Sequence, residues 1–414
     1  MQARAIPVRT PRGRRARPWR RTPFAAFLLS MLALTSPALT IAPLNSSEPG
    51  ARQVPDVARG VEASVPRRPR LVEEAERPIV VPVARPAPPA APEVDRGPLF
   101  AAALEAARTH GGAYGVAFAA VRDGTVIWAG ASGRARDGRT ELSPTAPLVI
   151  GSVTKTFVAA TVLQLVDEGR IGVDDPLRDH LPHLLRISDE ITIAQLLDHT
   201  SGLADVFNDT TRRGLEEEPG HSWAADEVLA TLHEPWYEPG EGWAYANTNY
   251  YLLAMLIEAV TGSPLAAELH ARFLDPLGLE ATSVLDGSQA GSPLDAAWTT
   301  IFWGSGAMGA SAVDLARWGD ALYAGDLLSP GSRAAMLDFN RDDYGFGAQR
   351  LEVDDIDGHG HTGLLNTYTT LLFHDPAERV TLALLVNRSH VDLGGMLAAE
   401  PAGGPSLLEL ALDD

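Results

Sequence analysis

Apolar and polar residues recur with helical and strand periods over most of the chain. Residues 98–110 carry apolar positions at helical spacing and end at Gly111-Gly112, a pair typical of a helix C-terminus. Residues 113–121 and 125–131 are apolar runs on either side of Asp123-Gly124, which predicts two strands joined by a tight turn. We therefore expect the folded part to begin with a helix and a β-hairpin.

The middle and the end of the chain differ in period. Residues 152–172 and 249–261 are strongly apolar on a helical period, which predicts two helices. Residues 364–374 and 379–386 favour strands, with the sequence HDPAE as the turn between them. The order of helix, hairpin, helical middle and returning strands predicts an α+β fold in which one sheet is built from both ends of the domain.

The N-terminal region has the composition of a targeting segment and a linker. Residues 1–23 contain eight Arg and no acid, and residues 24–42 are mostly apolar, which predicts a signal peptide or an N-terminal membrane anchor over residues 1–42. Both interpretations make the protein an exported one: periplasmic, cell-surface or secreted. Residues 43–96 hold 11 of the 31 prolines, which predicts a disordered Pro/Ala-rich tether before a folded domain over residues 97–414.

Composition limits the chemistry that the chain can perform. It has no Cys, which excludes disulfides, thiolate nucleophiles, Cys-ligated zinc and lipid attachment at a cysteine. The formal net charge is −19, and the part after the Arg-rich start is more acidic still. Such a body repels nucleic acid, so we expect no nucleic-acid partner.

Lys155 is the only lysine among the 34 Lys and Arg residues, and it follows Ser152 by three positions in the sequence GSVTKTF. Residues at i and i+3 are neighbours on one helix face. A serine hydroxyl needs a base that can be neutral near pH 7, which a buried lysine can supply and an arginine cannot. The apolar flanks favour this interpretation over a helix cap beside a solvated lysine.

Two further stretches carry polar groups at element boundaries. The sequence PGEGWAYANTNYYLL places Tyr245 and Asn247 just before a helix, where a phenol could relay a proton and an amide could orient a substrate. Taken alone, Asn247 is as well explained as a helix cap. The sequence GHGHTGLLNTY places His361, Thr362 and Gly363 at the start of a strand, where Gly allows close backbone approach. The alternative is a Gly-rich turn with a surface histidine.

Together these stretches resemble the serine β-lactamase and penicillin-binding-protein superfamily, in its class C β-lactamase and D-alanyl-D-alanine carboxypeptidase branch. The motifs there are Ser-x-x-Lys, Tyr-x-Asn and Lys/His-Thr-Gly, in this order. The similarity extends through nearly all of residues 98–390 and includes LLDHTSGL, DPLGLEAT and AVDLARW. It implies the β-lactamase/transpeptidase-like fold, an antiparallel sheet flanked by helices with an inserted, mostly helical region.

The resemblance implies a role for each catalytic residue. Ser152 would be the acylated nucleophile, and Lys155 would serve as its base while sharing protons with Tyr245. Whether Lys155 or Tyr245 acts first stays open. The backbone N–H groups of Ser152 and Leu364 would form the oxyanion hole. No metal or cofactor is expected.

The substrate-binding residues follow the family only in part. Asn247 would bind the substrate's amide side chain, and His361, Thr362 and Gly363 would line the opposite wall. His361 stands where β-lactamases of this class usually have Lys. The carboxypeptidases bind the substrate carboxylate with an Arg on the preceding strand and a Thr after Thr-Gly. The matching places here hold Gln349 and Leu364.

The implied function is an exported serine acyl hydrolase most like a D-alanyl-D-alanine carboxypeptidase or penicillin-binding protein. The alternatives are an esterase of the same fold, a class C-like β-lactamase, or a non-enzymatic module that recognises penicillin or binds the cell wall. The expected partner is a small-molecule or peptide substrate, namely a peptidoglycan stem peptide, a β-lactam or an ester. We expect a monomer, with membrane anchoring through residues 24–42 as an option.

Two other hydrolase classes are less well supported by the sequence. A metal hydrolase could use the pairs His359-x-His361 and His180-x-x-His183, but no further His/Asp cluster follows at suitable spacing. An α/β-hydrolase is disfavoured because the chain lacks a Gly-x-Ser-x-Gly motif. His199 in LLDHTSGL is interpreted as part of a structural turn.

Overall fold

The computed structural model describes residues 96–184, 187, 189–288, 292–340 and 342–413. The segments expected to be a signal or anchor and a tether lie outside these residues, apart from Arg96. The first described helix, α2, spans Gly97–Gly111 and corresponds to the helix predicted over 98–110.

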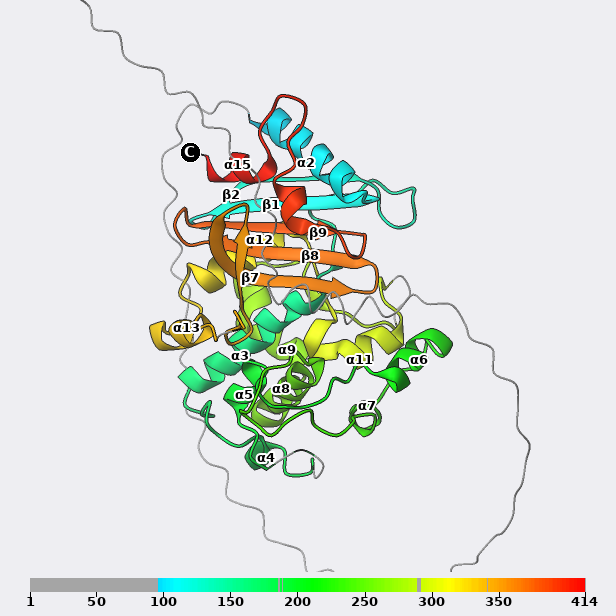
Figure 1. Cartoon of the computed structure of the whole chain (residues 1–414), viewed down its shortest axis with the longest axis vertical. Coiled ribbons are helices and arrows are strands. Elements are labelled where there is room, and N and C mark those ends of the chain that lie inside the picture. Colours follow the sequence, from blue (N-terminus) through cyan, green and yellow to red (C-terminus); the bar gives the residue numbers. More distant parts are fainter. Residues whose placement is uncertain (1–95, 185–186, 188, 289–291, 341, 414) are drawn as a thin grey trace, which may run out of the picture.

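The main sheet has six strands in the order β2-β1-β9-β8-β7-β6, and every neighbouring pair is antiparallel. Its strands are β1 (Gly115–Arg122), β2 (Thr125–Gly133), β6 (Gln349–Val353), β7 (Ile356–Leu365), β8 (Tyr368–Asp375) and β9 (Val380–Val386). The first two come from the start of the domain and the other four from its end (Figure 1). The prediction of a sheet built from both ends of the domain is confirmed.

Turn residues explain why one strand boundary was predicted correctly and another was not. Asp123 and Gly124 have φ angles of 49° and 79°, the positive values that a two-residue hairpin turn requires. The strand predicted over 364–374 is confirmed from Tyr368 onward as β8, but it does not begin at 364, because residues 364 and 365 are the end of β7. Asn366 lies between them with a φ of 53°, a conformation that Asn tolerates better than most residues. The turn between the two strands has only two residues, Asn366 and Thr367, so the strand propensity of its flanks concealed it.

The main sheet is covered on both faces, which explains why its strands are almost continuously apolar. Along β1, Val116 and Phe118 point into a core covered by α2, α14 and α15, whereas Ala117 and Ala119 point into the larger core. Helix α12 packs on that second face beside β1 and β9. These helices are α12 (Ala312–Tyr323), α14 (Leu393–Leu397) and α15 (Leu407–Leu412).

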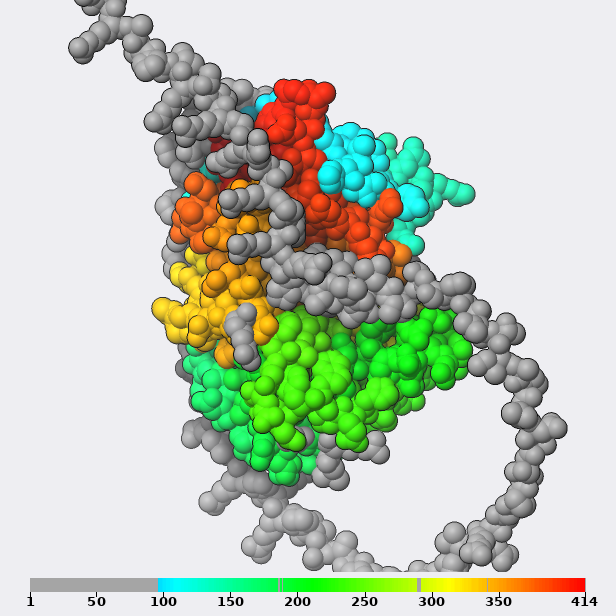
Figure 2. Space-filling model, viewed as in Figure 1, coloured from blue at the N-terminus to red at the C-terminus, as the bar shows by residue number. Residues whose placement is uncertain are grey.

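The residues between β2 and β6, apart from α12, form the mostly helical region expected from the resemblance. In the space-filling view much of it, coloured green, forms one end of the molecule, and the two ends of the domain, cyan and red, form the other (Figure 2). A small sheet in the order β3-β5-β4 also belongs to this part of the chain. The elements are β3 (Leu148–Val149), η1 (Gly151–Val153), α3 (Thr154–Asp167), α4 (Leu177–His180), α5 (Ile193–Leu197), α6 (Asp209–Glu217), α7 (Ala225–Ala230), α8 (Asn247–Thr261), α9 (Leu265–Leu269), η2 (His270–Leu274), α10 (Asp275–Leu277), β4 (Ser283–Val284), α11 (Ala296–Gly306), β5 (Met308–Ala310) and α13 (Pro330–Met336).

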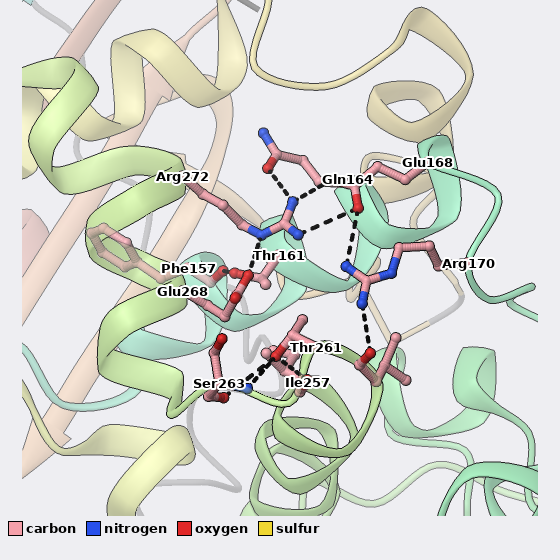
Figure 3. Close-up of polar contacts among 11 residues, drawn as sticks. Phe157, Thr161, Gln164, Glu168, Arg170, Ile257, Thr261, Ser263, Glu268 and Arg272 are labelled. Carbon is pink, nitrogen blue, oxygen red and sulfur yellow. Dashed lines mark hydrogen bonds and ion pairs between the residues drawn. The ribbon is translucent and has the colours of Figure 1, made fainter. Parts of the chain in front are cut away.

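Helix α3 is buried over most of its length, as its apolar sequence leads us to expect. Polar contacts hold its C-terminal end (Figure 3). The Arg272 guanidinium donates to Gln164 Oε1 at 3.1 Å, to Glu168 Oε1 at 2.5 Å and to Glu268 Oε2 at 2.9 Å. These contacts join α3 to α9 and η2, so the helix is fixed at the end far from Ser152.

Within the described residues, no single helix is long and apolar enough to cross a membrane. Among the same residues, one bent pair, Asn247–Thr261 and Leu265–Leu277, with an angle of 78° between its halves, reaches that length and composition.

Candidate active site

Ser152 and Lys155 lie where the chain enters α3, as the sequence predicts. Ser152 belongs to the 3₁₀ turn η1, and Lys155 is in the first turn of α3. The Lys155 Nζ atom is 3.2 Å from Ser152 Oγ. Lys155 is 0% exposed, so the alternative of a solvated lysine does not describe this structure.

The Lys155 amine is surrounded by acceptors and aromatic rings. It donates to the Ser305 carbonyl oxygen at 2.7 Å and to Asn247 Oδ1 at 2.9 Å. The ring centroids of Tyr245 and Tyr250 lie 4.8 and 5.5 Å from Nζ. Burial lowers the pKa of Lys155 from 10.5 to about 7, because the ammonium loses its hydration. The amine can therefore exist uncharged beside the Ser152 hydroxyl near neutral pH.

Tyr245 is affected by burial in the opposite sense to Lys155. Burial raises the pKa of the Tyr245 phenol above its usual range, and a hydrogen bond with the Ser152 side chain opposes that shift only in part. The resting site thus favours a protonated Tyr245. Of the two groups, Lys155 is the one whose pKa suits a base near pH 7.

Asn247 is the first residue of α8, and protein groups engage both ends of its amide. Its Oδ1 accepts from Lys155 Nζ, and its Nδ2 donates to the Asp205 carboxylate at 3.1 and 3.3 Å. Sequence reasoning did not identify Asp205. The signal that could have found it is an acid inside the apolar sequence GLADVF, directly after LLDHTSGL.

His361 lies in the second half of β7 rather than at the start of a strand. Its Nε2 accepts from the Tyr344 hydroxyl at 3.0 Å, and its Nδ1 donates to the Thr362 carbonyl oxygen at 2.6 Å. Burial, followed by the charge of Lys155, lowers the pKa of His361 to about 3. The imidazole is neutral at pH 7 and does not supply the cation that a lysine would at this position.

Thr362 contacts the preceding strand instead of being free to bind an anion. Its backbone N–H and its Oγ1 both donate to Gln349 Oε1, at 2.9 and 3.0 Å. Arg350, the next residue on β6, is largely exposed and lies 3.9 Å from an oxygen of Asp343. The position that holds an Arg in carboxypeptidases is therefore occupied by an uncharged amide that braces Thr362.

Two glycines let β7 pack directly against the turn that carries Ser152. A Cβ atom on Gly363 would lie 2.0 Å from the Ile150 carbonyl oxygen and 3.3 Å from Ser152 N. A Cβ atom on Gly151, whose φ is +53°, would lie 2.8 Å from Leu364 N. The backbone N–H groups of Ser152 and Leu364 are thus held close together, as an oxyanion hole requires.

His199 lies behind Tyr245 and braces the segment that leads into α8. Its ring centroid is 4.3 Å from that of Tyr245, and its Nδ1 accepts from Ala246 N at 3.3 Å and from Asn249 Nδ2 at 2.8 Å. Burial lowers the pKa of His199 well below its usual range. A φ of 64° puts it in a turn, which agrees with a structural role.

His359 and His361, one of the two pairs that could have suggested a metal site, have different neighbours in the structure. His361 contacts Tyr344, whereas His359 packs near Tyr323 and His374. Within the described ranges, no group of three or more His, Cys, Asp or Glu side chains could hold a metal ion.

A family model described as Beta-lactamase matches residues 100–400. The chain belongs to the β-lactamase family. It has the β-lactamase/transpeptidase-like fold, and it is a serine hydrolase of the group that includes penicillin-binding-protein homologues and D-amino acid amidases.

Two curated relatives match part of the β-lactamase-family domain. Protein flp of Staphylococcus aureus (strain NCTC 8325 / PS 47) is 33% identical over 155 residues, which cover 36% of this chain and 30% of that protein. Penicillin-binding protein 4* of Bacillus subtilis (strain 168) is 25% identical over 279 residues, covering 58% of this chain and 60% of that protein. The matched regions are thus less than two thirds of the length of either relative.

Two solved structures match over more of their length. A D-stereospecific amidohydrolase from Streptomyces sp. is 28% identical with a TM-score of 0.63, covering 73% of this chain and 99% of that one. The D-amino acid amidase from Ochrobactrum anthropi SV3, complexed with L-phenylalanine amide, is 25% identical with a TM-score of 0.59. That match covers 70% of this chain and 91% of the amidase.

Proposed function

We propose that this β-lactamase-family chain hydrolyses amides of D-amino acids or D-peptides through a covalent acyl-enzyme on Ser152. The observation that carries the proposal is the Lys155 amine, wholly buried and 3.2 Å from Ser152 Oγ. No lysine in a merely structural role needs to lose its charge in this way. The pair thus has the geometry and the pKa of a nucleophile with its base.

The proposed reaction has two halves. The lone pair of neutral Lys155 takes the Ser152 proton as Oγ attacks the carbonyl carbon, and the negative charge that forms on oxygen is bound by the N–H groups of Ser152 and Leu364. The leaving amine receives a proton relayed through Tyr245, and the acyl group stays on Ser152. Water then attacks the ester by the same relay and frees the acid. Each oxyanion donor contributes about 10²–10³ in rate, and the proton relay on the order of 10²–10⁴.

The preference for amides rests on what faces Thr362. Gln349 Oε1 accepts hydrogen bonds from the backbone N–H and from the hydroxyl of Thr362. Arg350 is exposed and lies beside Asp343. A substrate ending in a carboxylate therefore finds no guanidinium there, whereas an uncharged amide loses nothing. The names of the two solved relatives, an amidohydrolase and an amidase, agree with this substrate class.

A carboxypeptidase or penicillin-binding activity is the second candidate. It is favoured by the similarity to penicillin-binding protein 4* and by a histidine, rather than a lysine, before Thr362-Gly363. An esterase would also fit, because Leu364 is apolar and an ester needs no anion site. A class C-like β-lactamase is less well supported, since neutral His361 replaces the cation. A purely binding module would not need the proton relay.

Intact-mass spectrometry after rapid mixing tests the proposal. The panel contains a D-amino acid amide, a D-Ala-D-Ala peptide, a fluorescent penicillin and a short-chain nitrophenyl ester, with Ser152→Ala as the control. We expect turnover and a trapped acyl adduct with the D-amino acid amide, and no adduct on Ser152→Ala. If adducts form only with the other compounds, the substrate class is not an amide of a D-amino acid. An adduct that still forms in Ser152→Ala would show that Ser152 is not the nucleophile.

We also propose that the protein is exported, on the strength of residues 1–42, and that it works as a monomer. N-terminal sequencing of the cell-associated and secreted protein tests the first point, and sedimentation tests the second. A full-length cytoplasmic product would contradict export.

A further inference from the structure

Asp205 is an acid beside the active site whose role no motif explains. It lies half-buried between α5 and α6, three residues after Gly202. Its Oδ1 accepts from Phe207 N at 2.9 Å, and both of its oxygens accept from Asn247 Nδ2, at 3.3 and 3.1 Å. In the described part of the chain no ion pair joins Asp205 to a basic side chain. Its negative charge is therefore directed at the active site without a direct counter-ion.

The Asn247 amide lies between one donor and one acceptor. Lys155 donates to its oxygen, and the Asp205 carboxylate, which only accepts, takes its nitrogen. A flipped amide would turn a donor toward the amine and an acceptor toward the carboxylate, and both contacts would be lost. Asp205 thus fixes which end of Asn247 faces Lys155.

From this chain of contacts we propose that Asp205 is a positioning residue, which acts through Asn247 to hold the Lys155 amine against Ser152 and to set the charge of that amine. It does not touch the reacting atoms. The proposal concerns the same site as the proposed function, but its test does not depend on which substrate the enzyme prefers.

The surroundings of Lys155 leave Asp205 as the acid that acts on it. Ser152, Asn247 and the Ser305 carbonyl are uncharged and bind the amine directly. Among the other titratable groups around it, Tyr245 and Tyr250 present their rings and are protonated, and His199 and His361 are neutral because burial lowers the pKa of both.

The two charges influence each other reciprocally. The Asp205 charge opposes the lowering of the Lys155 pKa by burial, and the Lys155 charge opposes the raising of the Asp205 pKa by burial. Without the carboxylate, burial would act on Lys155 alone, and the amine would be neutral at still lower pH. The Asp205 carboxylate therefore has two effects. It orients the Asn247 amide, and its charge keeps the pKa of Lys155 higher than burial alone would.

Asp205→Asn separates these effects from simple packing. The variant keeps the size of the side chain and one oxygen that can accept from Phe207 N and Asn247 Nδ2, but it removes the charge. We expect the pKa of Lys155 to fall by about one unit, because the Asp205 charge favours the ammonium and its removal leaves burial unopposed. The acid limb of kcat/KM should move to lower pH by the same amount. Asp205→Ala, which also frees the amide, should lower kcat on the order of 10²-fold with a smaller change in KM.

The decisive measurement uses the fact that the chain has one lysine. In full-length protein grown with ¹³C-labelled lysine, the Lys155 Cε resonance reports the charge of one group as pH is varied. Asp198→Asn is the matched control, because Asp198 is also a half-buried acid whose pKa is raised by burial, but it contacts Thr200 rather than Asn247. A midpoint lowered by about one unit in Asp205→Asn and unchanged in Asp198→Asn supports the proposal. Equal midpoints in all three proteins overturn it.

Circular dichroism must first show that each variant is folded. If Asp205→Asn does not fold, Asp205→Ser takes its place, because a hydroxyl can still accept from Phe207 N, and the same downward shift is expected. A shift without any acyl adduct in the panel above would reject the proposed function and keep this inference. An acyl adduct without a shift in the Lys155 midpoint would reject this inference and keep the proposed function.

Discussion

A basic side chain lies at each end of α3, and its surroundings have opposite effects on its pKa at the two ends. At its C-terminal end, Arg272 lies among Glu168, Glu268 and Gln164, and these ion pairs raise the pKa of its guanidinium against the effect of burial (Figure 3). At its N-terminal end, the Lys155 amine contacts a hydroxyl, an amide oxygen and a backbone carbonyl, and burial lowers its pKa to about 7. One cation is held permanently charged to fix the helix, and the other is kept near neutrality.

This difference in pKa gives a reason for a single lysine in a chain whose other basic residues of this kind are all arginines. Arginine suits the structural end because its planar fork binds two carboxylates and it never loses its proton. Lysine suits the catalytic end because desolvation can neutralise it. The surrounding residues follow the same rule: carboxylates touch Arg272, whereas the nearest acid to act on Lys155, Asp205, is separated from it by Asn247.

Exchanging lysine and arginine at the two ends of α3 should have the largest effect on activity. In Lys155→Arg a permanently charged group replaces the base, and we expect acylation of Ser152 to slow by on the order of 10⁴. Stopped-flow acylation with an amide or ester substrate measures it. Arg272→Lys is the control and should stay within about twofold of the unaltered protein. Comparable rates for Lys155→Arg and the unaltered enzyme would show that no neutral amine is needed.

The backbone contact that β7 makes with the Ser152 turn is the next target. Gly363→Ala would place a methyl group 2.0 Å from the Ile150 carbonyl oxygen, so β7 and the turn must separate. We expect acylation to fall about 10²–10³-fold, as for the loss of an oxyanion donor. Gly331→Ala is the matched control, because its methyl group would meet only Ser329 Oγ at 3.7 Å. If both variants acylate normally, the proposed oxyanion hole is misplaced.

The structural end of α3 should respond in stability instead of rate. Arg272→Lys loses the forked contacts with Glu168 and Glu268 but keeps the charge, so we expect the free energy of unfolding to fall by about 1 kcal/mol. Urea unfolding measures the change, with kcat/KM recorded on the same sample. A change in kcat/KM larger than the change in folded fraction would mean that this end also controls the active site.

Acidification should weaken the fold through its buried histidines. Burial lowers the pKa of His359 to about 4 and that of His361 and His374 to about 3. Between pH 6.5 and about 4 these histidines bind protons in the unfolded chain but stay neutral in the folded protein. The free energy of unfolding should therefore decrease as pH falls through that window. The lowered pKa of His199 acts in the same direction, and the raised pKa values of Asp198 and Asp205 act in the opposite one, so two carboxyls oppose four imidazoles.

Urea titrations at pH 7, 5.5 and 4.5 check this smallest effect. In His374→Gln the free energy of unfolding should decrease less between pH 7 and 4.5 than in the unaltered protein, since one histidine with a lowered pKa is removed. A free energy of unfolding that is flat or rises over this range would contradict the burial of these rings in their neutral form.

Local signals made much of the fold predictable. Asp123-Gly124 marks its hairpin because both positions need positive φ, and the apolar sequence around Lys155 favours a buried helix. The β7–β8 turn was missed because it consists of only Asn366 and Thr367, and it depends on the local conformational preference of Asn366. No periodicity rule identifies such a turn.

The active site was predictable only as far as its motifs reach. The order of three motifs brought Ser152, Lys155, Tyr245 and Asn247 into one hypothesis, and the structure places them together. Asp205 and the Ser305 carbonyl were missed because they meet these residues across 42 and 150 positions of sequence. Such contacts depend on how α8 and α11 pack beside α3, and spacing in the sequence does not reveal that packing.

The most direct test of the account is the pKa of Lys155 in the unaltered protein, read from the Cε resonance of its single lysine between pH 5 and 11. We expect one titration with a midpoint near 7, because the amine is wholly buried and has no carboxylate in contact. A midpoint near the ordinary lysine value of 10.5 would contradict the proposal that Lys155 is the base for Ser152.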